Sequence, residues 1–182
     1  MEKQGKKNIV FLAKSLDGFI AGPNGEIDWL DTIPNPDQND MGYVRLMHEI
    51  DAIVMGRASF DTVCSFEGEW PYSKHVFVLS NTIQELPKFY QDKASLLSGS
   101  VHEILGQLHD KGFYNLYIDG GKTIQSFLKE DLIDELRITT IPILLGSGIP
   151  LFSVMTNSLV FNHIKTEVFL GQLVQSHYSR IR

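Results

Sequence analysis

Short apolar runs alternate along the chain with segments in which apolar residues recur every three or four positions. Eight runs have the composition of strands, and several of them, residues 9–12 and 52–55 among them, lack strict alternation, as in strands that are covered on both faces. The expected strands are residues 8–16, 52–55, 75–80, 95–97, 115–119, 135–145, 159–169 and 173–181. This pattern predicts a sheet with helices on either side.

Three apolar stripes at helical spacing lie between these strands. They comprise Met41, Val44, Met47 and Ile50, then Ile104, Leu105 and Leu108, and finally Ile124, Phe127 and Leu128. The second helix has the clearest ends, because Ser100 and Glu103 form a capping-box pattern and Gly112 suits the position after the last turn. Strands that alternate with single helices predict a largely parallel α/β sheet.

Two regions depart from this alternation. The segments 159–169 and 173–181 are separated only by a few residues around Gly171, which predicts an antiparallel hairpin and hence a mixed sheet. Residues 21–39 form a connection longer than usual, and long loops in compact domains are often lids or binding loops. We expect a lid there.

Composition limits the class of protein. The chain has 182 residues, a formal net charge of −6 and one cysteine, Cys64. This size predicts one domain over residues 1–182, with residues 1–7 flexible. The charge disfavours nucleic acid or an anionic membrane as partner. The apolar run 9–13 is too short for a signal peptide, and a lone cysteine forms no intramolecular disulfide, so we expect a cytoplasmic protein.

Three strand ends carry groups that suit an anionic ligand. Gly120 and Gly121 stand between a buried strand and a helix, where backbone N–H groups and the helix dipole can hold a phosphate, although a ligand-free turn has the same pattern. Arg57 follows Gly56 after another strand, either as a phosphate donor or as a surface arginine. Ser80 ends a third. Because α/β sheets bind ligands outside such ends, the three together favour a dinucleotide site.

The order of several motifs resembles the dihydrofolate reductase-like superfamily. The segments are AKSLDGFIAG (13–22), VMGR (54–57), VLS (78–80) and IDGGKTIQSFL (118–128). The later segments 132–136, 141–148 and 151–152 resemble the riboflavin-biosynthesis reductase branch, the RibD C-terminal domain. The resemblance covers residues 8–181 and implies a mixed, mostly parallel eight-stranded sheet with helices on both faces and a C-terminal antiparallel hairpin.

The resemblance also implies an activity and a cofactor. It points to an NADPH-dependent reductase, similar to dihydrofolate reductase or 5-amino-6-(5-phosphoribosylamino)uracil reductase, that transfers a hydride to a small pteridine- or pyrimidine-like heterocycle. By motif, Ala13 and Ile20 would border the nicotinamide, Gly56, Arg57 and Ser59 would hold phosphates, Leu79 and Ser80 would flank the 2′-phosphate, and Gly120, Gly121, Lys122, Thr123 and Ile124 would hold the pyrophosphate. It further implies a homodimer, and the apolar edge segment 138–145 supports this, because it is long for an uncovered strand.

Three departures from the family pattern narrow the substrate. Asp119 stands where dihydrofolate reductase has a third glycine, which resembles the riboflavin branch instead. After Arg57, however, the chain lacks the arginine with which riboflavin enzymes hold a ribityl phosphate. One cysteine cannot supply the ligands of the zinc deaminase that is often fused to those reductases. The chain is therefore similar to standalone bacterial members of the superfamily.

The proton donor has one main candidate. Asp40 lies 15 residues before Met55, the spacing of the substrate-binding carboxylate in dihydrofolate reductases, but it is equally placed to cap the following helix. Asp28 and Asp31 on the lid are alternatives. The six histidines show no metal-binding spacing, and no metal is expected. Cys64 is expected to be inert.

Two other functions are compatible with these residues. One is a nucleotide-binding protein without catalysis, acting as a sensor or assembly subunit. The other keeps the fold but replaces the cofactor with a flavin or another phosphorylated nucleotide.

Overall fold

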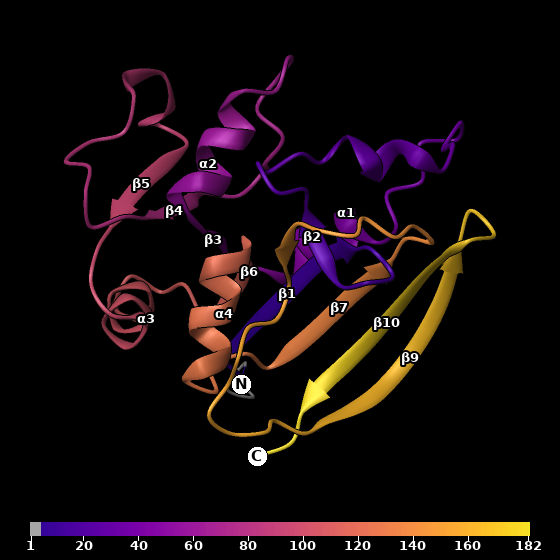
Figure 1. The fold of residues 1–182 in the computed structure, drawn as a ribbon. Coiled ribbons are helices and arrows are strands. Elements are labelled where there is room, and N and C mark those ends of the chain that lie inside the picture. Colours follow the sequence, from indigo (N-terminus) through magenta and orange to yellow (C-terminus); the bar gives the residue numbers. More distant parts are fainter. Residues whose placement is uncertain (1–4) are drawn as a thin grey trace.

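The computed structural model describes residues 5–182 and has an eight-stranded sheet at its centre (Figure 1). The strand order is β5-β4-β3-β6-β1-β7-β10-β9. The strands are β1 (Lys7–Lys14), β3 (Ala52–Gly56), β4 (Val76–Leu79), β5 (Ala94–Leu97), β6 (Asn115–Asp119), β7 (Glu135–Thr140), β9 (Phe161–Phe169) and β10 (Leu173–Arg180). All the pairings up to β7 are parallel, and β10 is antiparallel to both of its neighbours. The expected mixed, mostly parallel sheet with a C-terminal hairpin is confirmed.

Helices cover both faces of the sheet, as predicted. On one face, α1 (Tyr43–Glu49) and α2 (Arg57–Cys64) pack against β3 and β4 through a core that includes Leu46 and Phe60. On the other, α3 (Val101–Asp110) and α4 (Gly121–Lys129) bury their apolar stripes against β1, β6 and β7. Figure 1 shows α4 lying across this second face. Four of the five residues of β3 are buried, which explains its unbroken apolar run.

The predicted helix boundaries have different outcomes. The capping box of α3 is confirmed: Ser100 and Glu103 exchange hydrogen bonds, and Gly112 follows with φ +87°. The first helix begins later than expected, at Tyr43, because Met41 and Gly42 have positive φ. Its apolar face was also misplaced. Val44 is 56% exposed, because the face that a 3.6-residue period presents to the sheet is formed by the buried set Leu46, Met47 and Ile50.

The predicted strand over residues 135–145 was too long. β7 ends at Thr140, since Pro142 has no N–H to donate to a ladder and the Ile143 N–H turns back to the Ile141 carbonyl, 2.8 Å away. β7 also lies between β1 and β10, so it is not the exposed edge on which the homodimer argument was partly based. The sequence pattern missed a small second sheet of β2 (Phe19–Ala21) and β8 (Ile149–Pro150).

Short elements complete the chain. Two 3₁₀ helices, η1 (Asp28–Thr32) and η2 (Lys88–Tyr90), lie in long connections. Of the segment 1–7 that was expected to be flexible, Lys7 belongs to β1, where it pairs with Asn115, and residues 1–4 lie outside the described residues. Within residues 5–182, no helix has the length and apolar character needed to cross a bilayer.

Candidate active site

A large cavity of about 1220 Å³ lies at the carboxyl ends of the parallel strands. Such an edge is where open α/β sheets bind their ligands. Twelve of the thirteen site residues expected from the sequence line this cavity: Ala13, Ile20, Asp40, Gly56, Arg57, Ser59, Leu79, Ser80, Gly120, Gly121, Lys122 and Thr123. The volume exceeds the 300–1,000 Å³ that is usual for one small ligand. It can therefore hold two ligands side by side.

The glycines of the cavity wall allow two connections to touch. Gly120 has φ +86°, and a Cβ at this position would lie 2.3 Å from the Ser59 Oγ. A Cβ at Gly56 would lie 2.9 Å from the Thr123 Oγ1. Side chains larger than hydrogen would thus separate the β3–α2 connection from the β6–α4 connection. The two together form a narrow backbone cradle.

The first turn of α4 opens into this cradle. The Ile124 N–H already donates to the Gly120 carbonyl, 2.9 Å away, and the Ile124 side chain is fully buried in the core. The expectation that Ile124 contacts a pyrophosphate is therefore wrong, since neither its amide nor its side chain is available. The amides before it, from Gly121 to Thr123, are those that a helix leaves without intrahelical acceptors, and the helix dipole favours an anion beside them.

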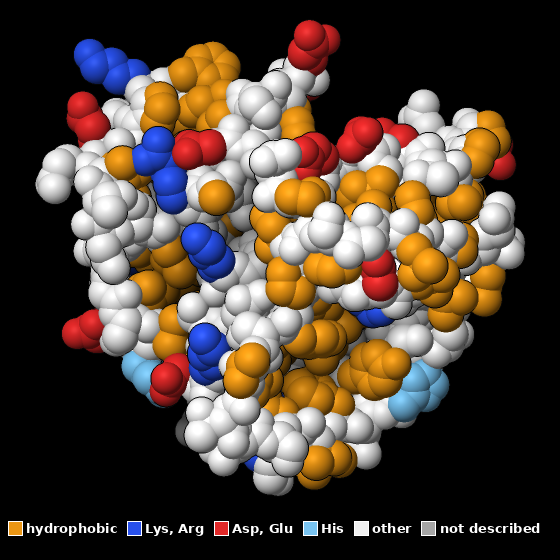
Figure 2. Space-filling model, in the orientation of Figure 1, with side chains coloured by type: hydrophobic (Ala, Val, Ile, Leu, Met, Phe, Trp, Pro, Cys, Tyr) orange, Lys and Arg blue, Asp and Glu red, His pale blue; other side chains and the backbone are white. Residues whose placement is uncertain are grey.

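Arg57 and Lys122 add positive charge to the border of the cavity. Figure 2 shows basic side chains on the surface between the α2 and α4 regions. The Arg57 Nε donates to both carboxylate oxygens of Asp61, each at 2.7 Å. This pair fixes the guanidinium at the start of α2. Ser80 is less free than expected, because its Oγ accepts the amide of Thr82 at 3.2 Å in a tight turn.

A carboxyl group and three tyrosines line another part of the cavity. They are Asp119, Tyr43, Tyr72 and Tyr117. The Tyr117 hydroxyl donates to the Phe11 carbonyl at 2.8 Å. Burial raises the pKa of the Asp119 carboxyl, and the Gly120 amide and the Tyr117 hydroxyl only partly oppose this shift. Burial also raises the pKa of Tyr43 to about 12 and the pKa values of Tyr72 and Tyr117 further. These phenols keep their protons at neutral pH.

The sequence analysis treated Asp119 only as a departure from a glycine motif. Its position at the end of a buried strand, two residues after Tyr117 and so on the same face, was the signal for an acid that faces the cavity. Asp40 lies differently. Its Oδ2 accepts the Val44 amide at 2.7 Å and its Oδ1 accepts the Gly42 amide at 3.1 Å. These bonds lower the pKa of Asp40 and match the alternative expectation of a cap for the following helix.

The long connection after β2 forms one side of the cavity. It contributes Asn24, Gly25, Ile27 and Leu30 to the lining. Trp29 in η1 is 7% exposed and packs with Ile141 and Leu173, so the connection is anchored at one point. Asp28 and Asp31 also lie in η1, but neither contributes to the cavity lining.

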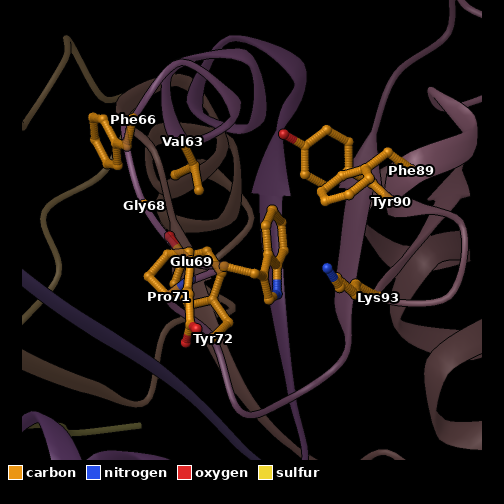
Figure 3. A pocket seen from close by; sticks show the side chains of 10 residues that line it. Val63, Phe66, Gly68, Glu69, Pro71, Tyr72, Phe89, Tyr90 and Lys93 are labelled. Carbon is orange, nitrogen blue, oxygen red and sulfur yellow. The ribbon is translucent and has the colours of Figure 1, made fainter.

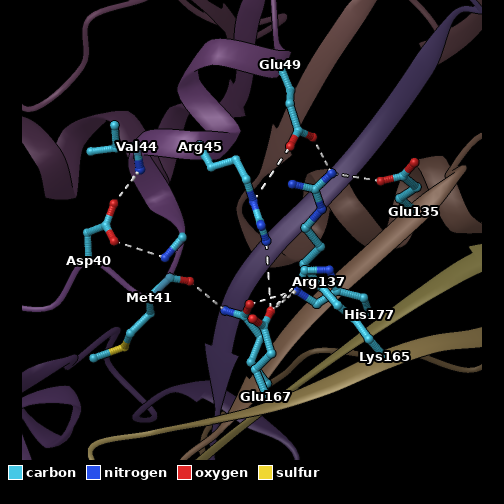
Figure 4. A network of polar contacts seen from close by, with 12 residues as sticks. Asp40, Met41, Val44, Arg45, Glu49, Glu135, Arg137, Lys165, Glu167 and His177 are labelled. Carbon is cyan, nitrogen blue, oxygen red and sulfur yellow. Dashed lines mark hydrogen bonds and ion pairs between the residues drawn. The ribbon is translucent and has the colours of Figure 1, made fainter.

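A polar network supports the wall of the cavity from behind (Figure 4). Arg137 of β7 donates to Glu49 of α1 and, at 2.9 Å, to Glu135. The Arg45 Nη2 atom of α1 lies 3.8 Å from the Glu167 Oε2 atom of β9. The network therefore joins α1, which contributes Tyr43 to the cavity, to the C-terminal half of the sheet.

The last two candidates for chemistry are a metal site and the Cys64 thiol. Among residues 5–182, His, Cys, Asp and Glu side chains do not gather in threes as a metal site would need. Burial raises the pKa of the Cys64 thiol, which disfavours a reactive thiolate.

The arrangement of the sheet and its helices is that of the dihydrofolate reductase-like fold. A dihydrofolate reductase of Enterococcus faecalis, solved with NADP(H), superposes with a TM-score of 0.67 at 19% identity and covers 96% of each chain, which shows the shared fold. The sequence matches the RibD C-terminal domain over residues 6–172. The chain belongs to the RibD C-terminal domain family, as the resemblance predicted.

Two relatives match nearly the whole chain. A protein of Shewanella sp. PV-4, named for riboflavin biosynthesis, is 56% identical with a TM-score of 0.94, and the match covers 97% of this chain and 99% of that one. The Bacillus subtilis (strain 168) protein YwjB is 36% identical over 178 residues, 96% of this chain and 98% of its own. The family and the structural neighbours are RibD-like and dihydrofolate reductase-like reductases.

Proposed function

We propose that this protein is an NADPH-dependent reductase of a small pteridine- or pyrimidine-like heterocycle. One observation carries the proposal: a single cavity joins a cradle at Gly120–Gly121 that suits an anion to a partly buried carboxyl group, Asp119. A dinucleotide needs the cradle, and a substrate that gains a hydride needs a proton source.

The residues of the cradle suit a phosphorylated dinucleotide. Gly56, Gly120 and Gly121 leave space where a Cβ would otherwise stand, and the amides of the first turn of α4 can hold an anion there. Arg57 and Lys122 add positive charge, and Leu79 and Ser80 line the same cavity. When bound, NADPH supplies the hydride.

We propose Asp119 as the proton donor. Its raised pKa keeps a proton on the carboxyl group closer to neutral pH than an exposed aspartate does, which general acid catalysis requires. Tyr117, which lies on the same face of β6, holds its own hydroxyl on the Phe11 carbonyl and lines the wall beside this group. The proton passes from the Asp119 carboxyl to the substrate nitrogen or oxygen of the reduced double bond.

Paired variants test this proposal. Asp119→Asn keeps the size of the side chain but cannot supply a proton, so we expect turnover of NADPH with dihydropterin or aminouracil substrates to fall about 10²- to 10⁴-fold, with NADPH affinity unchanged. Asp40→Asn, the matched control, should keep near-normal turnover. Loss of turnover in Asp40→Asn alone would restore Asp40 as the donor. NADPH binding without turnover of any heterocycle would indicate a nucleotide-binding protein instead.

We also propose that the protein is a homodimer, formed through the face of β9 and β10 next to α4. Val168 and Val174 are paired across the two strands, on the face of the sheet that carries Ile138, and are 60% and 40% exposed. Figure 2 shows hydrophobic side chains gathered over this part of the sheet. Apolar surface of this kind often marks a protein interface.

A further inference from the structure

A buried hydroxyl group lines the active-site cavity, on Thr139 of β7. Thr139 is 5% exposed, and it shares the cavity lining with Asp119 of β6. β6 and β7 pair with opposite edges of β1, so the two strands lie about 10 Å apart. A heterocycle that receives a proton from Asp119 therefore meets Thr139 with a different part of its ring.

The side-chain amide of Gln175 in β10 determines what the Thr139 hydroxyl can do. The Gln175 Nε2 lies 3.0 Å from the Met41 carbonyl oxygen and 3.0 Å from the Thr139 Oγ1. A carbonyl oxygen only accepts, so the nitrogen end of the amide is the one that faces Met41 and Thr139. The oxygen end accordingly lies 2.7 Å from the His177 Nε2, in the network that Figure 4 shows around Met41 and His177. Gln175 thus donates one N–H to Met41 and the other to Thr139.

This direction leaves the Thr139 hydroxyl with a proton to donate. A threonine hydroxyl has one proton and two lone pairs, and Gln175 occupies a lone pair. Within residues 5–182, this is the hydrogen bond that the Thr139 side chain makes, and in it the hydroxyl accepts. A buried donor without an acceptor costs free energy. The cavity that Thr139 lines is the place where a ligand can supply the acceptor.

The structure has a smaller, aromatic cavity without such a group. It has a volume of about 570 Å³ and lies beside the end of α2, where Tyr72, Phe89 and Tyr90 contribute to its walls (Figure 3). Each residue that lines it is half-buried or exposed. A ligand in the aromatic cavity meets polar groups that water also reaches, whereas the Thr139 hydroxyl is shielded from solvent.

We infer that the Thr139 hydroxyl, directed by Gln175, donates a hydrogen bond to a ring carbonyl oxygen of the heterocyclic substrate. The inference rests on the proposed function, because it names the chemical feature by which that substrate is selected. Pterins and aminouracils carry ring carbonyl oxygens, which accept. An amino group in the same place would point a second proton at the hydroxyl proton and leave the buried donor unpaired, so such an analogue is rejected.

Two pteridines that differ in one ring substituent test the inference without turnover. 6-Methylpterin carries a ring carbonyl, and 2,4-diamino-6-methylpteridine has an amino group in its place. Calorimetric titration gives the Kd of each for the wild type and for Thr139→Val, in which a methyl group replaces the hydroxyl. Loss of one hydrogen bond should weaken 6-methylpterin about 2- to 10-fold and should not weaken the diamino compound. Equal losses for both, or no saturable binding of 6-methylpterin to the wild type, would overturn the inference.

Three further variants separate direction from structure. Thr139→Ser keeps the hydroxyl and should keep the preference for 6-methylpterin. Thr140→Val makes the same change one residue later, on the opposite face of β7 and outside the cavity lining, and should leave both Kd values unchanged. Gln175→Met releases the hydroxyl, which can then also accept, so the preference should fall below that of the wild type. An unchanged preference in Gln175→Met would show that the amide does not direct the hydroxyl.

Measurements with NADPH separate this inference from the proposed function. Thr139→Val should keep the wild-type affinity for NADPH, and a loss of that affinity in place of the affinity for 6-methylpterin would overturn the inference. A preference for 6-methylpterin that depends on Thr139, without oxidation of NADPH by any heterocycle, keeps the inference and contradicts the reductase proposal. Turnover that falls in Asp119→Asn but is unchanged in Thr139→Val does the reverse.

Discussion

The side-chain amide of Gln175 in β10 donates a hydrogen bond to the main-chain carbonyl of Met41, 3.0 Å away at the start of α1. The same amide donates to the Thr139 Oγ1, also at 3.0 Å, and its oxygen lies 2.7 Å from the His177 Nε2. Gln175 is 1% exposed. The C-terminal hairpin is thereby bound to the backbone that carries one wall of the active-site cavity.

Gln175→Leu removes all three hydrogen bonds and leaves their buried partners unsatisfied. Because a buried polar group without a partner destabilises a fold by about 1–3 kcal/mol, we expect the free energy of unfolding in urea to fall by at least that amount. Gln172→Leu, in the exposed turn between β9 and β10, should change it by less than about 0.5 kcal/mol. Equal stability of the two variants would show that the network contributes little.

Stability should fall as the pH is lowered from 7.5 to 5.5. Burial lowers the pKa of His177, and burial has the same effect on His75 and His109. Below the unfolded pKa of about 6.5, the unfolded chain takes up protons that the folded chain rejects, so stability present above that pH is lost. Each histidine contributes at most about 1.4 kcal/mol per pH unit.

His177→Gln tests the contribution of one group. The charged neighbours Lys165 and Arg137 add to the shift, and Glu167 opposes it. Chemical denaturation at several pH values gives the free energy of unfolding as a function of pH. This free energy should depend less steeply on pH in the variant than in the wild type. An unchanged slope would mean that His177 has the same pKa in the folded and the unfolded protein.

Gly121→Val should weaken NADPH binding by about 10-fold or more, because a side chain beside the cradle crowds Ile20 and shifts the first turn of α4, which displaces one charge-assisted contact. A Cβ at Gly121 would lie 2.8 Å from the Ile20 Cδ1 and 3.3 Å from the Ile149 Cγ2, and the end of the Ile20 side chain can move. We therefore expect a folded but less stable protein. Gly106→Val in α3, where nothing lies within 4 Å, is the control. Fluorescence titration gives the NADPH affinity of both variants. Equal affinities of Gly121→Val and Gly106→Val would contradict the assignment of the cradle to NADPH.

Arg57→Ala should weaken NADPH about 10- to 150-fold and leave NADH nearly unchanged, if Arg57 holds the 2′-phosphate by a charge-assisted contact. Its partner Asp61 repels the same phosphate, so Asp61→Asn should strengthen NADPH binding. Calorimetric titration with NADPH and with NADH measures the two affinities of each variant. Equal losses for NADPH and NADH in Arg57→Ala would assign this residue to the pyrophosphate or the fold.

Light scattering at micromolar concentration should give the mass of a dimer. Val168→Glu places a charge on the exposed apolar face of β9 and should shift the protein toward monomer. Val44→Glu is the control, since Val44 is 56% exposed on α1, on the opposite face of the sheet. A monomeric wild type contradicts the proposed homodimer.

Local pattern was sufficient where one physical cause dominated. The buried run 52–55 predicted β3 because a strand covered on both faces needs apolar residues at every position. Ser100, Glu103 and Gly112 predicted the ends of α3 because capping depends on a few adjacent groups. The cavity residues at the strand ends were predicted because parallel strands bring their carboxyl ends to one edge.

Several features needed the tertiary structure. β2 and β8 are too short to show a period, and they form a sheet only because the chain brings residues 19–21 beside 149–150. The interior place of β7 depends on where the hairpin docks, which the composition of β7 does not encode. Asp40 had the spacing of a proton donor, but its surroundings, the Gly42 and Val44 amides, made it an ionised acceptor.

The sequence by itself determined the family, the alternation of strands and helices, and which strand ends carry anion-binding groups, because each follows from residues near one another in the chain. Only the tertiary structure decided which carboxyl group lies beside the tyrosines and that an aromatic cavity lies next to the active-site cavity. The pKa of Asp119 and the walls of that cavity depend on desolvation and contact among segments distant in sequence. Such segments meet only when the chain folds.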